Sequence, residues 1–349
     1  MDAVRKLLGD SLAYLYPAAL RVAVRTRIAD HLADGPLPPG RLAALAGAEP
    51  DHLRRVLRFL ATRDVFREDE NGAFHLTTAA SLLRSDSPLP VRSLVLLFTD
   101  PLYWLPAGCL EDTVRAGRTA FDDVFGAPIF DHLATDKAGA ELFSDAMAAL
   151  SEIEQDGIAA ACDLPQRATI VDIGGGLGGM LRTILTRNPG LRGVLYDREP
   201  VLHHHRLDDP AIAGRWETAA GDFYDQVPPG ADVYLLKRIL HDKTDTDCLR
   251  VLRAVRHAMP DGSRLLIVDP LVPAGGDIPP ATMLSDLLVM AVFGGRERTR
   301  DELAALLSEA DLLLHEVIPT TGTLTITEAH PTTRAQGPRP EGAPAARGR

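Results

Sequence analysis

The chain has 349 residues, 46% of them hydrophobic, and is therefore long enough for two domains with substantial buried cores. Its formal net charge of −11 argues against broad electrostatic attraction to nucleic acid or to an anionic membrane. No apolar run reaches the roughly 18 residues of a spanning helix, and the N-terminus lacks a signal peptide's apolar core. The cysteines are far apart and lack metal-ligand spacing, which indicates reduced thiols in the cytoplasm: Cys109, Cys162 and Cys248.

Residues 1–90 have a helical hydrophobic pattern with short breaks. Apolar side chains recur at three- and four-residue spacings in the last long helix: Leu53, Val56, Leu57 and Leu60. Asn71-Gly72 then separates two short apolar runs and predicts a β-hairpin, so this unit is typical of a winged helix. A DNA-binding regulator that senses a small molecule is one alternative, because three basic residues would lie on the recognition helix: Arg54, Arg55 and Arg58. The acidic net charge instead favours a solvated basic face.

Residues 91–160 are predicted to be mainly helical and contain several aromatic side chains. Residues 161–331 alternate between strands and helices, with strands expected over 169–173, 193–196, 232–236 and 264–268. This alternation predicts an α/β fold with a doubly wound, Rossmann-like parallel sheet, in which ligands bind at the carboxyl ends of the strands. The tail, residues 332–349, is rich in Pro, Gly, Ala and Arg and is expected to be disordered.

The most informative segment is the apolar strand 169–173 running into Gly174-Gly175-Gly176-Leu177-Gly178-Gly179. Glycine permits a tight turn and a close approach of backbone amides to a ligand. The spacing fits both the dinucleotide fingerprint and the loop of S-adenosylmethionine enzymes, so an NAD(P)-dependent oxidoreductase remains an alternative. Asp172 favours S-adenosylmethionine, because a carboxylate there would repel a pyrophosphate but suits an ammonium group.

Further polar residues follow the later strands. Asp197 lies where ribose hydroxyls would bind, and Asp222 with Phe223 could hold an adenine ring. His241, after the strand over 232–236, could act as a general base. Either of two acids could hydrogen-bond its ring and fix the tautomer: Asp269 and Glu297. The triplet His203-His204-His205 is interpreted as a surface feature, because consecutive positions point in different directions, and no metal site is expected.

In combination, four motifs resemble a known family: Val171-Asp172-Ile173-Gly174-Gly175-Gly176, Gly221-Asp222-Phe223, Leu236-Lys237-Arg238-Ile239-Leu240-His241-Asp242, and Gly294-Gly295-Arg296-Glu297-Arg298-Thr299. Over residues 10–330 the chain resembles the metal-independent, S-adenosylmethionine-dependent small-molecule O-methyltransferases. These are the enzymes of the plant caffeic-acid type and their bacterial polyketide-tailoring relatives.

The resemblance implies a role for each matching residue. The cofactor site would comprise Asp172, Gly174, Gly175, Gly176, Asp197, Asp222, Phe223 and Lys237. His241 would be the base, flanked by Glu297 and Asp269. The substrate pocket would draw on Trp104, Phe143, Met147, Asp242, Met290 and Phe293.

The resemblance also implies partners. The winged-helix unit would form a homodimer rather than bind DNA, and residues 91–160 would contribute to the pocket of an aromatic, phenolic acceptor. S-adenosylhomocysteine would be the product left by the cofactor. The chain departs from the family at two positions, with Lys243 in place of a common Trp and Asp269 in place of a common Glu. Neither removes the candidate base.

Overall fold

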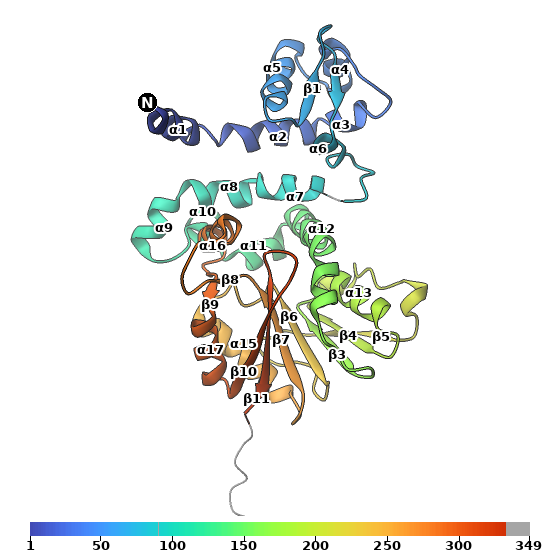
Figure 1. Ribbon diagram of the computed structural model, residues 1–349, viewed down its shortest axis with the longest axis vertical. Helices are drawn as coiled ribbons and strands as arrows, with labels where there is room; N and C mark the ends of the chain where they lie inside the picture. The colour runs from blue at the N-terminus through green and yellow to red at the C-terminus, as the bar shows by residue number, and fades with distance from the viewer. Residues whose placement is uncertain (90, 333–349) are drawn as a thin grey trace, which may run out of the picture.

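The computed structural model describes residues 1–89 and 91–332 (Figure 1). Its N-terminal unit consists of α1 (Asp2–Ser11), α2 (Leu15–Arg25), α3 (Ile28–His31), α4 (Pro39–Ala46), α5 (Pro50–Ala61), β1 (Phe66–Glu68), β2 (Phe74–Leu76) and α6 (Thr78–Ser81). The Glu49 carboxylate caps α5 by accepting the backbone N–H of His52 at 2.9 Å. The apolar stripe of α5 is buried and packs on α2, and β1 pairs antiparallel with β2. The predicted winged-helix pattern is thus confirmed.

The basic side chains of α5 face the hairpin. Arg58 Nε donates to Glu68 Oε2 at 2.7 Å, and an Arg54 guanidinium nitrogen lies 3.5 Å from Glu68 Oε1. Two of the three candidate DNA-binding arginines therefore already pair with a carboxylate of the wing, which favours a surface ionic role over DNA binding.

The helices that follow lie between the N-terminal unit and the large sheet (Figure 1). They are α7 (Val91–Phe98), α8 (Pro101–Gly108), α9 (Leu110–Ala116), α10 (Phe121–Phe125), α11 (Ile129–Thr135) and α12 (Lys137–Ala161). The long helix α12 packs against α7 at one end and against α13 (Gly179–Arg187) near the other. Among the described residues, no single helix is long and apolar enough to cross a membrane, although the bent pair Val91–Gly108 and Leu110–Ala116 reaches that length and composition together.

The C-terminal part is a seven-stranded sheet in the order β10-β11-β7-β6-β3-β4-β5. Its strands are β3 (Thr169–Ile173), β4 (Arg192–Asp197), β5 (Trp216–Ala220), β6 (Val233–Lys237), β7 (Arg264–Asp269), β10 (Leu312–Pro319) and β11 (Thr325–Pro331). The first five in chain order are parallel, as predicted. The last two differ: they form a hairpin that adds antiparallel to β7, so the sheet is mixed. A hairpin needs no crossover helix, so the βα alternation gave no sign of it.

The remaining elements are α14 (Glu199–Leu202), the 3₁₀ turn η1 (Pro210–Ile212), α15 (Asp245–Ala258), β8 (Leu271–Val272), α16 (Pro280–Val292), β9 (Arg298–Thr299) and α17 (Arg300–Glu309). Successive side chains of a strand point to opposite faces of the sheet, and here those on both faces are apolar. Helices therefore cover both faces. Tyr234 and Leu236 face α15 and α17, whereas Val233 and Leu235 face α12 and α13.

This topology brings the polar strand ends to one edge. β3 runs into the glycine loop, β4 ends at Asp197, β6 leads to His241 and β7 ends at Asp269. These strands are parallel neighbours, so the residues converge where ligands bind in such sheets. Apart from Thr332, the predicted disordered tail lies outside the described residues.

Candidate active site

The glycine loop begins the site. Gly174, Gly176 and Gly178 have φ values of +66°, +58° and +82°, a left-handed conformation that other residues adopt only with strain. A Cβ on Gly175 would lie 2.5 Å from Leu195 Cδ1 and 2.6 Å from the Asp172 carboxyl carbon. A Cβ on Gly176 would meet no atom within 4 Å among the described residues. The loop therefore packs tightly on Asp172 at Gly175, whereas the space beside Gly176 is open.

The Asp172 side chain lies beneath this loop. It is fully buried, and within residues 1–89 and 91–332 its Oδ2 has no hydrogen-bond partner. Burial raises the pKa of its carboxyl to about 7, although Lys237 opposes the shift. A buried carboxylate oxygen without a partner requires a cationic or hydrogen-bonding group. The ammonium group of S-adenosylmethionine meets that requirement, so the residues present fit this cofactor.

The other predicted cofactor residues surround the loop. Asp197 Oδ2 accepts the backbone N–H of Gly176 at 2.9 Å, and burial raises the pKa of this carboxyl. A Cβ on Gly174 would lie 3.4 Å from Phe223 Cε1, which places this ring against the loop. Asp222 is exposed and accepts the backbone N–H of Tyr224 at 2.8 Å. Asp197 and the Phe223 ring thus lie against the glycine loop, and Asp222 directly precedes that ring in the chain.

Lys237 and Arg238 share one carboxylate on α12. Glu154 Oε2 lies 2.8 Å from Lys237 Nζ, and Glu154 Oε1 lies 2.6 Å from the Arg238 guanidinium. Burial alone would raise the pKa of Glu154, but the two cations outweigh it and the pKa is lowered. Arg238, directly after β6, has φ of +54°, a strained conformation that this ion pair holds in place.

His241 and Glu297 form the centre of the site. His241 Nδ1 lies 2.9 Å from Glu297 Oε1, and both side chains are buried. Burial would lower the pKa of His241, but the hydrogen bond to Glu297 and the charges of Asp269 and Glu297 outweigh it, so the pKa is raised.

Glu297 is itself held from two sides. Ser285 Oγ donates to Glu297 Oε1 at 2.5 Å, and Asp286 accepts the backbone N–H of Glu297 at 2.8 Å. Parallel pairing of β9 with β8 keeps this segment beside the end of β7. Neither Ser285 nor Asp286 stood out in the sequence, because helix α16 brings them to the site without a motif of its own.

Asp269 lies on the other side of the histidine. Asp269 and His241 line the same small cavity, and burial raises the pKa of this carboxyl. Its Oδ1 has no hydrogen-bond partner among the described residues. Of the two predicted acids, Glu297 makes the hydrogen bond to the ring, whereas Asp269 acts through its charge.

The backbone around His241 is fixed by Arg298, which the sequence analysis did not single out. Its guanidinium donates to the carbonyls of Leu240 and Lys243, each at 2.8 Å, and also binds Asp245. Arg298 is buried. The arginine that follows Glu297 therefore locks the turn that carries the base.

Gly295 is expected to tolerate no side chain. A Cβ there would lie 2.2 Å from the His241 carbonyl oxygen and 2.6 Å from Asp242 Cα, both backbone atoms. We expect Gly295→Ala to lower the melting temperature, since overpacking costs about 1–3 kcal/mol, and to lower turnover by displacing the His241 turn. Gly275→Ala is the control, because a Cβ there meets no described atom within 4 Å. Equal melting curves and rates for the two variants would contradict this account.

Several predicted substrate residues gather in an aromatic cluster. The Phe293 ring centroid lies 5.9 Å from that of Phe130, 6.5 Å from Phe143 and 6.3 Å from Tyr103. Met147 packs against the same core. Trp104 is exposed on α8, and neither it nor Met290 belongs to this cluster in the described part of the chain.

Lys243 brings a positive charge into the site. Its Nζ lies 2.9 Å from Asp242 Oδ1 and 5.1 Å from the Phe130 ring centroid, with Phe223 at 5.5 Å. Lys243 was expected only as a departure from the family, and neither Phe130 nor Tyr103 was predicted as a site residue. Pocket and core aromatics have the same spacing along a helix, so the sequence could not separate them.

Known proteins match this chain along almost its whole length. A family model described as the O-methyltransferase domain matches residues 108–312, and one described as the O-methyltransferase dimerisation domain matches residues 11–86. The chain belongs to the O-methyltransferase family. The alternatives of a dinucleotide oxidoreductase and of a DNA-binding regulator are thereby set aside, and the predicted S-adenosylmethionine-dependent family is confirmed.

Individual relatives of this O-methyltransferase agree. Phenazine O-methyltransferase PhzM from Lysobacter antibioticus is 37% identical over 93% of this chain and 95% of that protein. Mitomycin biosynthesis 6-O-methyltransferase from Streptomyces lavendulae is 37% identical over 91% of each chain. The structure of CalO1, a methyltransferase in calicheamicin biosynthesis with S-adenosylhomocysteine bound, has 42% identity and a TM-score of 0.83, covering 95% of this chain and 98% of that one.

Proposed function

We propose that this protein methylates a phenolic hydroxyl of an aromatic small molecule in secondary-metabolite biosynthesis, with His241 as the general base. The observation that carries the proposal is the buried hydrogen bond between His241 Nδ1 and Glu297 Oε1, after the strand that pairs with β3, from which the glycine loop follows. An imidazole whose Nδ1–H donates to a carboxylate presents its Nε2 lone pair to the substrate.

The residues then have distinct tasks. Bound S-adenosylmethionine supplies an electrophilic methyl group. His241 Nε2 removes the hydroxyl proton of the acceptor, and Glu297 stabilises the imidazolium that forms. The charge of Asp269 acts in the same direction. A phenol has a pKa near 10, so proton removal matters at neutral pH. The helices that carry the aromatic cluster position the acceptor and exclude water.

The acceptor class is proposed from the pocket and the relatives. Phe130, Phe143 and Phe293 present aromatic faces that suit a flat ring system. The relatives include the 2,7-dihydroxy-5-methyl-1-naphthoate 7-O-methyltransferase of Streptomyces carzinostaticus, 31% identical. They also include aclacinomycin 10-hydroxylase RdmB of Streptomyces purpurascens, 33% identical, so family membership alone does not fix the reaction.

Two measurements test this function. We expect calorimetric titration to give micromolar binding of S-adenosylhomocysteine and no binding of NADH or duplex DNA. Incubation with S-adenosylmethionine and dihydroxylated naphthoates or phenazines should give a product heavier by one methylene group. Oxygen insertion into any of these acceptors, without methylation, would replace our proposal with the hydroxylase reaction.

The pH dependence of the rate follows from the raised pKa of His241. A raised folded-state pKa means that His241 keeps its proton until the pH exceeds 6.5, the ordinary value. The base works only when neutral, so kcat/KM is expected to rise with pH through a midpoint above 6.5. Glu297→Gln removes a charge that raises this pKa, so the midpoint should fall. The assay needs an acceptor that ionises well above this range, and equal midpoints would contradict the assignment.

We also propose a homodimer formed through the N-terminal helices. Helix α1 has no buried residue in the isolated chain and carries exposed apolar side chains that a partner would cover: Val4, Leu7 and Leu8. Light scattering should give twice 37.6 kDa. Leu8→Glu should shift the mass toward the monomer, whereas Leu313→Glu should not, although these leucines are 63% and 64% exposed. A monomer at every concentration of the wild-type protein would refute the dimer.

We further propose that the chain divides into three functional parts. Residues 1–90 would form the dimer, residues 91–160 would contribute to the acceptor pocket, and residues 161–331 would bind the cofactor. The separate cores of the N-terminal unit and of the middle helices support it. We propose a cytoplasmic location, which the free thiols of the three cysteines support.

A further inference from the structure

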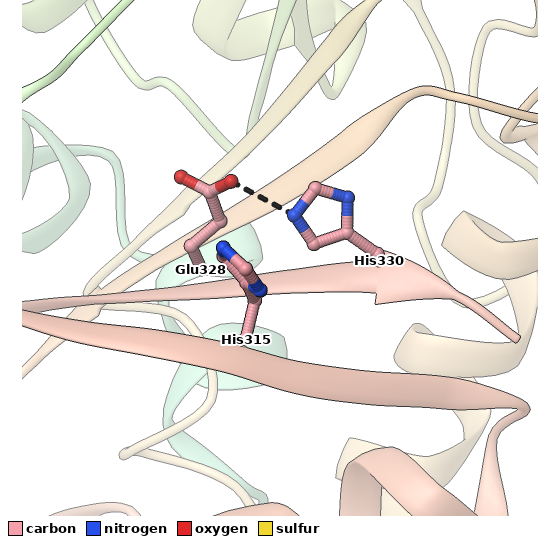
Figure 2. Close-up of side chains that lie close together, drawn as sticks. All are labelled: His315, Glu328 and His330. Atoms are coloured by element: carbon pink, nitrogen blue, oxygen red, sulfur yellow. Dashed lines mark hydrogen bonds and ion pairs between the residues drawn. The ribbon is translucent and has the colours of Figure 1, made fainter.

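A second cluster of ligand-type side chains lies on the hairpin at the edge of the sheet (Figure 2). His315 comes from β10, and Glu328 and His330 come from β11. One potential ligand atom from each residue lies within 4.8 Å of the other two. His330 Nε2 lies 2.9 Å from Glu328 Oε1, and the His315 and His330 ring centroids are 4.9 Å apart.

The backbone explains why these side chains meet. Glu328 and His330 are two residues apart on one strand and therefore point to the same face. In β10 the register shifts between Leu314 and Glu316, because Leu314 pairs with Ala329 whereas Glu316 pairs with Glu328. His315 is the extra residue of this β-bulge, and Figure 2 shows its ring beside the Glu328 carboxylate. Bulges of this kind aim side chains at specific sites.

Glu328 is held in place from its other oxygen. A guanidinium nitrogen of Arg264 lies 3.3 Å from Glu328 Oε2, and the same arginine donates to the backbone carbonyl of Asp163. The Glu328 carboxylate is largely buried, so its orientation is fixed. Oε1 is not used by Arg264 and is directed at His330 Nε2. Carboxylate ligands of metal ions are characteristically oriented by such outer hydrogen bonds.

We propose that His315, Glu328 and His330 bind a divalent transition-metal ion of the Zn²⁺ type. Two imidazoles and one carboxylate are a ligand set that Zn²⁺ accepts, with water as the fourth ligand. Zn–N and Zn–O bonds of about 2.0–2.2 Å place ligand atoms roughly 3.3 Å apart, so small rotations of the exposed His315 ring complete the geometry. Mg²⁺ and Ca²⁺ prefer oxygen ligands and do not suit this site.

The ion would cross-link the last two strands of the sheet rather than take part in catalysis. Glu328 pairs with Leu266 near the start of β7, whereas the catalytic edge lies at Asp269, which pairs with Thr325. β10 is an edge strand of the sheet, and a bound ion would tie it to β11. No motif marks this site in the sequence, because its ligands come from two strands and lack a common spacing pattern.

Calorimetric titration of the chelator-treated full chain with ZnCl₂ tests the proposal. We expect one equivalent to bind with a Kd of about micromolar order, and the melting temperature to rise by about 5 °C at a hundredfold excess over the Kd. His315→Ala and His330→Ala should each weaken binding at least tenfold. His203→Ala is the matched control, because His203 is an exposed histidine whose Nε2 lies 3.1 Å from Glu199 Oε1, outside the cluster. The control should bind as the wild type does.

Three results would overturn the proposal. One is the absence of Zn²⁺ binding by the wild type up to millimolar concentration. The second is unchanged binding in both His315→Ala and His330→Ala. The third is a thiolate charge-transfer band on Co²⁺ substitution, which would assign the ion to a cysteine. All variants should bind S-adenosylhomocysteine as the wild type does, which verifies that they are folded, and MgCl₂ should give no heat.

Discussion

Replacing His241 by alanine is expected to reduce turnover by about two to four orders of magnitude, the usual contribution of one positioned proton-transfer group. The affinity for S-adenosylhomocysteine should remain nearly unchanged, because the imidazole bonds to Glu297 and the glycine loop does not depend on it. The measurement is single-turnover methylation of a verified acceptor, so that product release does not hide the chemical step. His257→Ala is the control, since His257 is an exposed histidine at the end of α15.

Two further variants show whether proton removal is the lost step. Glu297→Gln should cost less than His241→Ala, because the amide still accepts a hydrogen bond from the ring but no longer stabilises the imidazolium. An acceptor with a much more acidic hydroxyl should recover part of the His241→Ala loss, since it arrives already ionised. Wild-type turnover by His241→Ala, with chemistry limiting, would mean that the enzyme works by proximity alone.

Replacing Asp197 by alanine is expected to raise the Kd for S-adenosylhomocysteine about tenfold to a hundredfold. Hydrogen bonds to a charged group are worth about 1.5–3 kcal/mol, and each 1.4 kcal/mol changes affinity tenfold. The variant would also lose the carboxylate oxygen that accepts the Gly176 N–H at 2.9 Å, so the loop itself would be less well ordered. Calorimetric titration measures the change directly.

The control for Asp197 is another acid on the same side of the sheet. Asp225 pairs with Arg250 at 2.7 Å and is exposed, so Asp225→Ala should bind S-adenosylhomocysteine as the wild type does. Asp197→Asn should lie between the wild type and Asp197→Ala, because it keeps the shape but not the charge. Unchanged affinity in Asp197→Ala would remove this residue from the cofactor site.

Much of the site could be predicted because strand ends are visible in the sequence. Asp172 and Asp197 lie at the ends of apolar strands and His241 follows one, and parallel strands bring such positions to one edge. Asp269 was predicted near the histidine because it also closes an apolar strand, whereas Glu297 was predicted from its polar stretch and the family motif. Only the structure distinguishes the acid that bonds the ring from the one that acts by charge.

Other features depend on contacts between distant segments. The aromatic cluster joins Tyr103 on α8, Phe130 on α11 and Phe293 after α16, and nothing local marks them as partners. The β10–β11 hairpin also escaped prediction, because Leu312–Pro319 contains a bulge that breaks the two-residue alternation. The burial of Arg298 could not be predicted, because an arginine beside Glu297 in a polar stretch is ordinarily exposed.

The carboxylate of Glu154 limits how this enzyme can be redesigned or diversified. Glu154 belongs to the helix that also carries Phe143 and Met147, yet it pairs with Lys237 at the end of the central strand and with Arg238 directly after it. A chimera that takes the acceptor-binding helices of a relative without an acid at this position would leave two buried cations unpaired. Breaking a buried ion pair in this way costs about 3–5 kcal/mol. Acceptor specificity can therefore change freely along α12 only where residue 154 is kept.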